Sequence, residues 1–115
     1  MTYKEALALA AKAAGIEGSW DTHANCFVPA TGSIFWNPLT DDGDALRLAV
    51  KLRLVVECGY LTVQVRYNYD EVEQWSLDDS GITETVHDFN GKDGGAVATR
   101  RAIVRAAAAI GESML

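Results

Sequence analysis

An aromatic ring, an amide and a carboxylate lie close together in the sequence, where they could bind a small ligand. Trp36 and Asn37 end a segment rich in β-favouring residues, and Asp44 follows within the acidic run 41–44. An indole can stack on a nucleobase, and an asparagine amide can hydrogen-bond the base edge. A carboxylate can accept hydrogen bonds from ribose hydroxyls. The combination favours a small nucleotide-like ligand, bound by Trp36, Asn37 and Asp44.

Arg100 supplies the positive charge that such a ligand would need. On a helical wheel it falls inside the apolar arc, between Val97 and Val104, whereas Arg101 points toward solvent. A guanidinium in that position needs an anionic partner, because burying it unpaired costs several kcal/mol. The sequence leaves two partners open, an internal carboxylate from the acidic stretch 68–90 or a ligand phosphate. We therefore add Arg100 to the predicted ligand-binding residues.

The sequence contains no recognisable catalytic, metal-binding or cofactor-binding signature. The two histidines, His23 and His87, belong to no catalytic motif, and no CxxC or HxxxH pair anchors a zinc site. The glycines of 91–95 match neither a phosphate-binding loop nor a dinucleotide fingerprint. Two cysteines are too few for a disulfide scaffold, so Cys26 and Cys58 are predicted to be buried thiols. We expect no enzymatic activity, no metal and no cofactor.

The elements that must position these residues follow from capping signals and hydrophobic periodicity. Thr2 and Glu5 form a capping-box pattern at the start of the first helix, and Gly15 suits a left-handed stop. The acids of 41–44 favour the start of a second helix, since carboxylates accept hydrogen bonds from free backbone amides there. Asp93 is a candidate cap for the third. We predict helices at 3–14, 42–52 and 94–112, a hairpin of 26–28 with 33–36, and strands at 53–57, 60–67, 71–77 and 82–88.

This order, α-β-β-α-β-β-β-(β)-α, predicts an α+β fold in which three helices pack on an antiparallel sheet of about four to six strands. The chain has 115 residues, which fits a single domain spanning 1–115. The third helix should lie along the sheet, with Val97 and Met114 among the residues of its buried arc. Alanine-rich first and third helices permit close helix approach and make a homo-oligomer plausible.

Charge narrows the classes of partner. The net charge of −6 disfavours direct binding to nucleic acid or to an anionic membrane, since both need a basic surface. No apolar run approaches the roughly 20 residues that a membrane span requires. The stretch 68–90 contains seven acids and no lysine or arginine. It is either a solvated acidic hairpin or a surface that mimics DNA and faces a basic protein groove. Its acids are Asp70, Glu71, Glu73, Asp78, Asp79, Glu84 and Asp88.

Two blocks, WNPLTDDGDALRLAVKL at 36–52 and ATRRAIVRAAAAIG at 98–111, together with the opening helix, resemble small uncharacterised proteins of tailed phages and prophages. The resemblance implies a phage protein in the cytoplasm of an infected bacterium, and it brings no activity or binding residues. Phage accessory genes of this size often encode counter-defence proteins. We therefore expect a protein that sequesters a nucleotide-like immune signal. The alternatives are an acidic inhibitor of a host defence nuclease or other host protein, and a structural or assembly component of the phage.

Overall fold

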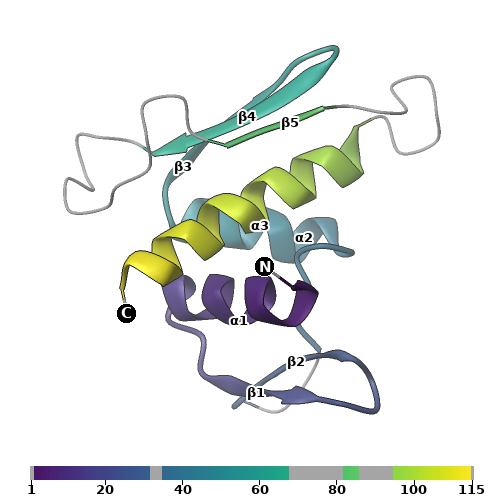
Figure 1. Ribbon diagram of the computed structural model, residues 1–115, viewed down its shortest axis with the longest axis vertical. Coiled ribbons are helices and arrows are strands. Elements are labelled where there is room, and N and C mark those ends of the chain that lie inside the picture. Colours follow the sequence, from purple (N-terminus) through teal and green to yellow (C-terminus); the bar gives the residue numbers. More distant parts are fainter. Residues whose placement is uncertain (1, 32–34, 68–81, 86–94, 115) are drawn as a thin grey trace.

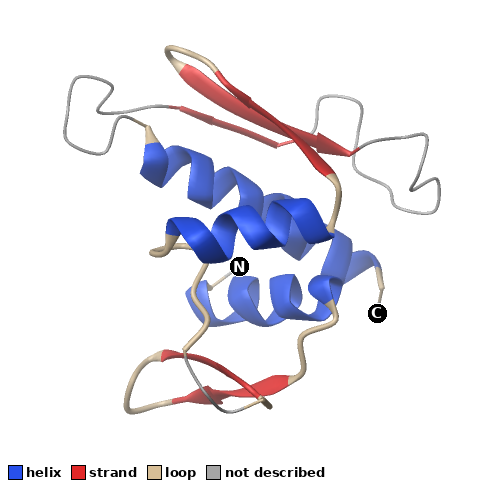
Figure 2. Cartoon of the chain, turned by 180° about the vertical axis from the view of Figure 1, so that it is seen from behind, coloured by secondary structure: helices blue, strands red, loops and turns tan. Residues whose placement is uncertain are grey.

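Helices form the middle layer of the fold, between two small antiparallel sheets (Figures 1 and 2). The computed structural model describes residues 2–31, 35–67, 82–85 and 95–114. The predicted α+β class is confirmed. The described strands, however, do not form the single sheet that was predicted: two make a separate hairpin on the far side of the helices. None of the described helices is long and apolar enough to span a membrane.

Helix α1 (Tyr3–Ala14) begins and ends as predicted. The Glu5 amide donates to Thr2 Oγ1 at 3.1 Å, and the Thr2 amide donates back to the Glu5 carboxylate at 3.3 Å. This reciprocal pair is a capping box. At the other end Gly15 adopts a left-handed φ of 73°, and the next amide folds back to the Ala11 carbonyl at 2.9 Å. Local signals alone therefore fix this helix.

The first hairpin has a different partner from the one predicted. Strand β1 (Gly18–Asp21) pairs antiparallel with β2 (Cys26–Pro29), whereas the prediction paired 26–28 with 33–36. The last β1 residue explains the difference, since its carboxylate accepts hydrogen bonds from two amides of the intervening turn and closes it. Trp36 forms an isolated antiparallel bridge to Phe27 on the other side of β2, so the predicted pairing is present at this one position. Residues 33 and 34 lie outside the described ranges.

The second sheet carries the helices on one face. Its described strands are β3 (Leu54–Cys58), β4 (Thr62–Tyr67) and β5 (Ile82–Thr85), in the order β3-β4-β5 and antiparallel throughout. Val63 and Val65 are 1% and 0% exposed, so alternate side chains of β4 face the core. The strand begins two residues later than predicted, and Leu61 is 56% exposed. The strand predicted at 71–77 and the end of the one predicted at 82–88 lie outside the described residues.

Helix α2 (Asp42–Lys51) matches the prediction to within one residue, whereas the start of α3 (Ala96–Ser113) differs. Asp93 was predicted to cap α3. The N-cap is instead Gly95, with φ at 92° and no side-chain hydrogen bond to the helix amides, because α3 begins two residues later than predicted. Asp93 itself lies outside the described residues. The predicted apolar arc is buried in its middle, but Val97 and Met114 are 36% and 47% exposed because they lie in the terminal turns.

Helix α3 is the centre of the core and lies between α1 and the sheet (Figure 1). The alanine-rich faces of α1 and α3 are buried against each other within one chain. The two helices lie very close together at Gly111, where an added Cβ would lie 2.0 Å from the Leu9 carbonyl oxygen. This contact within one chain explains why α1 and α3 are rich in alanine. Their alanine content therefore no longer supports a homo-oligomer, and the homo-oligomer stays a prediction.

Candidate functional site

Trp36 is part of the core. Its side chain is 7% exposed, and its ring meets Phe27 edge to face with a centroid distance of 5.8 Å. This geometry is a favourable aromatic contact in a buried cluster. The ring is therefore largely covered by its neighbours, which leaves little of its face for a base to stack on.

Asn37 and Asp44 hold the segment between them in place. The backbone amide of Asn37 donates a hydrogen bond to Asp44 Oδ2 at 2.9 Å, and the side-chain oxygen of Asn37 accepts one from the backbone amide of Leu39 at 3.0 Å. Asn37 Nδ2 also donates to the Tyr3 hydroxyl. Asp44 is 8% exposed and accepts a further hydrogen bond from Arg47 Nη2 at 2.8 Å. These polar groups, predicted to contact a ligand, all have partners within the chain.

Arg100 ties α3 to the start of α2. Its Nε donates to the Leu39 carbonyl at 2.9 Å, and its Nη1 donates to Asp42 Oδ1 at 2.6 Å. Of the two partners that the sequence left open, an internal carboxylate is present. Within the described residues it is Asp42 of α2, whereas most of the stretch 68–90 lies outside them. The guanidinium side chain is 16% exposed, whereas the Asp42 side chain is 78% exposed. The ion pair therefore has one shielded member and one member in water.

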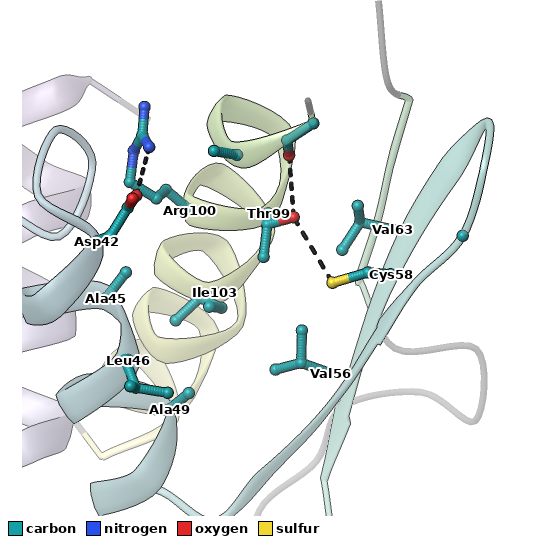
Figure 3. A pocket seen from close by; sticks show the side chains of 13 residues that line it. Asp42, Ala45, Leu46, Ala49, Val56, Cys58, Val63, Thr99, Arg100 and Ile103 are labelled. Carbon is teal, nitrogen blue, oxygen red and sulfur yellow. Dashed lines mark hydrogen bonds and ion pairs between the residues drawn. The ribbon is translucent and has the colours of Figure 1, made fainter. Parts of the chain in front are cut away.

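The Arg100–Asp42 pair lies at the edge of a cleft with a volume of about 510 Å³, called here the α2–α3 cleft (Figure 3). Helices α2 and α3 form two walls, and strands β3 and β4 form the third. This volume is in the range of small-molecule sites. The cleft is lined by Asp42, Ala45, Leu46, Ala49, Val56, Cys58, Gly59, Val63, Gly95, Ala96, Thr99, Arg100 and Ile103.

Polar groups of this cleft lie toward the N-terminal end of α3. Thr99 Oγ1 donates to the Gly95 carbonyl at 2.9 Å, and Cys58 Sγ lies 3.9 Å from the same hydroxyl. Together with the Arg100–Asp42 pair they form one end, while aliphatic side chains line the rest (Figure 3). The first turn of α3 itself contains no acidic residue, so no carboxylate of that turn offsets the positive end of the helix dipole. This end is suited to an anionic group.

A second cavity, called here the Trp36 cavity, lies near the hairpin and has a volume of about 720 Å³. Trp36 and Asp44 line it, and Arg47 is the described cation in its lining. Arg47 is 70% exposed and lies 2.8 Å from Asp44 and 3.8 Å from Asp41. Trp36 and Asp44 thus border one cavity and Arg100 borders the other. The structure does not bring the four predicted residues into a single site.

The two cysteines have opposite environments. Cys26 is buried as predicted, and burial raises the pKa of its thiol, with a smaller contribution from Asp21. Cys58 is exposed on the cleft wall, so the prediction of burial is wrong for this residue. It lies at the end of β3, next to the turn that leads into β4, where a side chain is covered on one side only. Within the described ranges, no group of three or more His, Cys, Asp or Glu could hold a metal ion.

Most of the acidic stretch 68–90 lies outside the described residues. Glu84 is the described acid, and its Oε1 accepts a hydrogen bond from Arg105 Nη1 at 2.9 Å. The Glu84 side chain is 14% exposed, so this carboxylate serves the packing of β5 against α3. The hypothesis of an acidic inhibitor surface stays a prediction.

Sequence reasoning missed most residues of the α2–α3 cleft. Leu46, Val56 and Ile103 are aliphatic, so their types carry no sign that a cavity lies between them. The available signal was Thr99 and Arg100, which together with Arg101 interrupt an apolar run that begins directly after paired glycines. No family model, curated protein or solved structure matches this chain. Function must therefore be inferred from the cleft and the sequence.

Proposed function

We propose that this chain binds and sequesters a small nucleotide-like ligand in the α2–α3 cleft, without transforming it. The observation that carries the proposal is the cleft itself, which has aliphatic walls and a shielded guanidinium at one end. The walls suit an uncharged nucleoside, and Arg100 suits a phosphate. In line with the phage resemblance, the ligand is an immune signal of the infected bacterium, and binding lowers its free concentration.

Arg100 is well placed to exchange its internal partner for a ligand phosphate. A guanidinium binds phosphate through paired charge-assisted hydrogen bonds, which gain strength as water is excluded. Arg100 is 16% exposed, so an anion beside it is screened less than one at the surface. Asp42 is 78% exposed and can return to water at little cost when a phosphate replaces it. The ion pair thus keeps the guanidinium oriented until the ligand arrives.

The Trp36 cavity is a poorer site for the same ligand. Arg47 is 70% exposed, so water screens its attraction for an anion. It also lies between Asp41 and Asp44, whose carboxylates repel a phosphate. Arg47→Gln therefore serves as a control for binding at this cavity.

Calorimetric titration tests the proposal with a panel of cyclic dinucleotides, ADP-ribose derivatives and mononucleotides. The expected result is saturable binding by at least one of them. Cys58 reports the place of binding, since a ligand in the cleft should slow its alkylation by a maleimide. Buried Cys26 provides the internal reference. If no compound binds, or if binding leaves Cys58 alkylation unchanged, the proposal is wrong.

Two substitutions separate a ligand role from a purely structural one. Arg100→Gln should weaken binding about tenfold or more, as expected for loss of a charge-assisted hydrogen bond. Arg101→Gln removes the same charge from an exposed position of α3 and should leave affinity unchanged. Asp42→Asn removes the competing carboxylate and should raise affinity. If Arg100 only stabilises the fold, Arg100→Gln and Asp42→Asn will both lower thermal stability and neither will change affinity.

A further inference from the structure

We infer that the α2–α3 cleft selects ligands with one anionic group at one end of an uncharged, largely apolar body. The inference rests on the proposed use of this cleft and specifies the class of ligand. For nucleotides it means that monophosphates are preferred over cyclic dinucleotides and over nucleoside triphosphates.

The charged side chains that line the cleft lie together at one end of it. Among the described residues that line the cleft, Arg100 is the only cation and Asp42 the only anion. Both lie at the same end, as Figure 3 shows. One phosphate can pair with Arg100. A second would lie beside Asp42, which repels it, or among aliphatic side chains, where desolvation of a charge is costly.

The remaining walls of the cleft are aliphatic. Leu46 and Ala49 of α2, Val56 of β3 and Ile103 of α3 surround the part of the cleft away from Arg100 (Figure 3). No aromatic ring occurs among the described lining residues. The described walls therefore hold the ligand body by burial of apolar surface. Burial favours a body that carries no further charge, because each added charge must lose its water.

The size of the cleft suits a small ligand. Its volume of about 510 Å³ is in the lower half of the range for small-molecule sites, roughly 300–1,000 Å³. A ligand that places its anionic group at Arg100 has room for one compact body along the cleft.

The experiment compares five compounds by calorimetry and by protection of Cys58 from alkylation. They are adenosine, adenosine 5′-monophosphate, adenosine 5′-triphosphate, a cyclic dinucleotide and octanoate. The monophosphate should bind about tenfold or more tightly than adenosine and than either multiply charged nucleotide. Equal or tighter binding of the triphosphate or the cyclic dinucleotide overturns the inference.

The octanoate result separates this inference from the proposed function. If octanoate protects Cys58 and no nucleotide does, the inference that the cleft selects one anionic group is supported and the proposal of a nucleotide-like ligand is wrong. If a cyclic dinucleotide binds best, the nucleotide proposal stands and the inference falls. If no compound protects Cys58, both are wrong.

A charge introduced at the aliphatic end provides a positive test. Leu46 is 64% exposed at the cleft rim, so Leu46→Lys adds a second cation there without disturbing the core. It should raise affinity for the triphosphate or the cyclic dinucleotide about tenfold. Val50→Lys is the matched control, because Val50 is 67% exposed one helical turn later and does not line the cleft. Equal effects of the two variants contradict the inference.

Discussion

Replacing Gly111 with alanine should destabilise the fold, although the same change stabilises most helices. Gly111 lies in the last turns of α3, where that helix crosses α1. An added Cβ would lie 2.0 Å from the Leu9 carbonyl oxygen and 2.7 Å from the Leu9 carbonyl carbon, whereas ordinary contacts are 3.4–4 Å. The obstacle is backbone, which cannot rotate away as a side chain can. The two helices must therefore move apart.

Two effects of opposite sign decide how much Gly111→Ala changes the free energy of unfolding. Alanine is favoured over glycine in a helix by about 1 kcal/mol. Overpacking a close interface costs typically about 1–3 kcal/mol, and separating α1 from α3 also loosens the buried alanines between them. With a backbone overlap of this size we expect the upper part of that range, so Gly111→Ala should lower the free energy of unfolding by about 1–2 kcal/mol.

Urea unfolding followed by circular dichroism measures this difference, with Gly43→Ala as the matched control. A Cβ at Gly43 meets the Arg47 guanidinium and the Asp41 carboxylate at 3.2 Å, so small side-chain shifts relieve the contact, unlike the 2.0 Å backbone overlap at Gly111. That variant should be neutral or slightly more stable than the parent. If Gly111→Ala is as stable as Gly43→Ala, the close approach of α1 and α3 is not as described.

Three further predictions concern individual groups. In the folded protein, a thiol reagent should react quickly with Cys58 alone, and Cys26 should react only after unfolding, because burial also raises its pKa. The hydrogen bond from Arg66 lowers the pKa of Glu57 below its ordinary value of 4.5, so Glu57→Gln should reduce the melting temperature at neutral pH. That difference should disappear as the pH falls through the lowered pKa, where the parent carboxylate also becomes neutral. Asn37→Ala should lower the free energy of unfolding by about 1–2 kcal/mol, measured by urea unfolding, since it removes the side-chain hydrogen bonds to the Leu39 amide and the Tyr3 hydroxyl.

The sequence predicted best those elements whose signals are local. The capping box of α1 and the acidic start of α2 each satisfy backbone groups within a few residues, so their patterns determine the structure. The partner of β2 could not be chosen in this way. Residues 18–21 and Trp36 both pair with β2, one on each side, and alternation alone does not rank two partners.

The candidate site likewise combines a local feature that the sequence predicted with long-range features that it could not predict. A helical wheel was enough to predict that Arg100 needs an anionic partner, because the rule concerns one buried charge. It could not identify Asp42, which is 58 positions away in the sequence. The cleft itself was unpredictable for a further reason. Its walls are aliphatic residues that would look the same in a fully packed core, and whether they touch depends on how α2 and α3 lie relative to the sheet.

The Arg100–Asp42 pair also connects the two blocks that carry the phage resemblance. Residues 36–52 contain α2, and residues 98–111 contain most of α3, so these blocks supply two walls of the cleft and its charged end. The third wall, formed by β3 and β4, belongs to a part of the chain outside the resemblance. This division suggests separate tasks. The helices would hold the anionic group at a fixed position, while Val56 and its neighbours on the sheet would contact the ligand body and so determine which body fits.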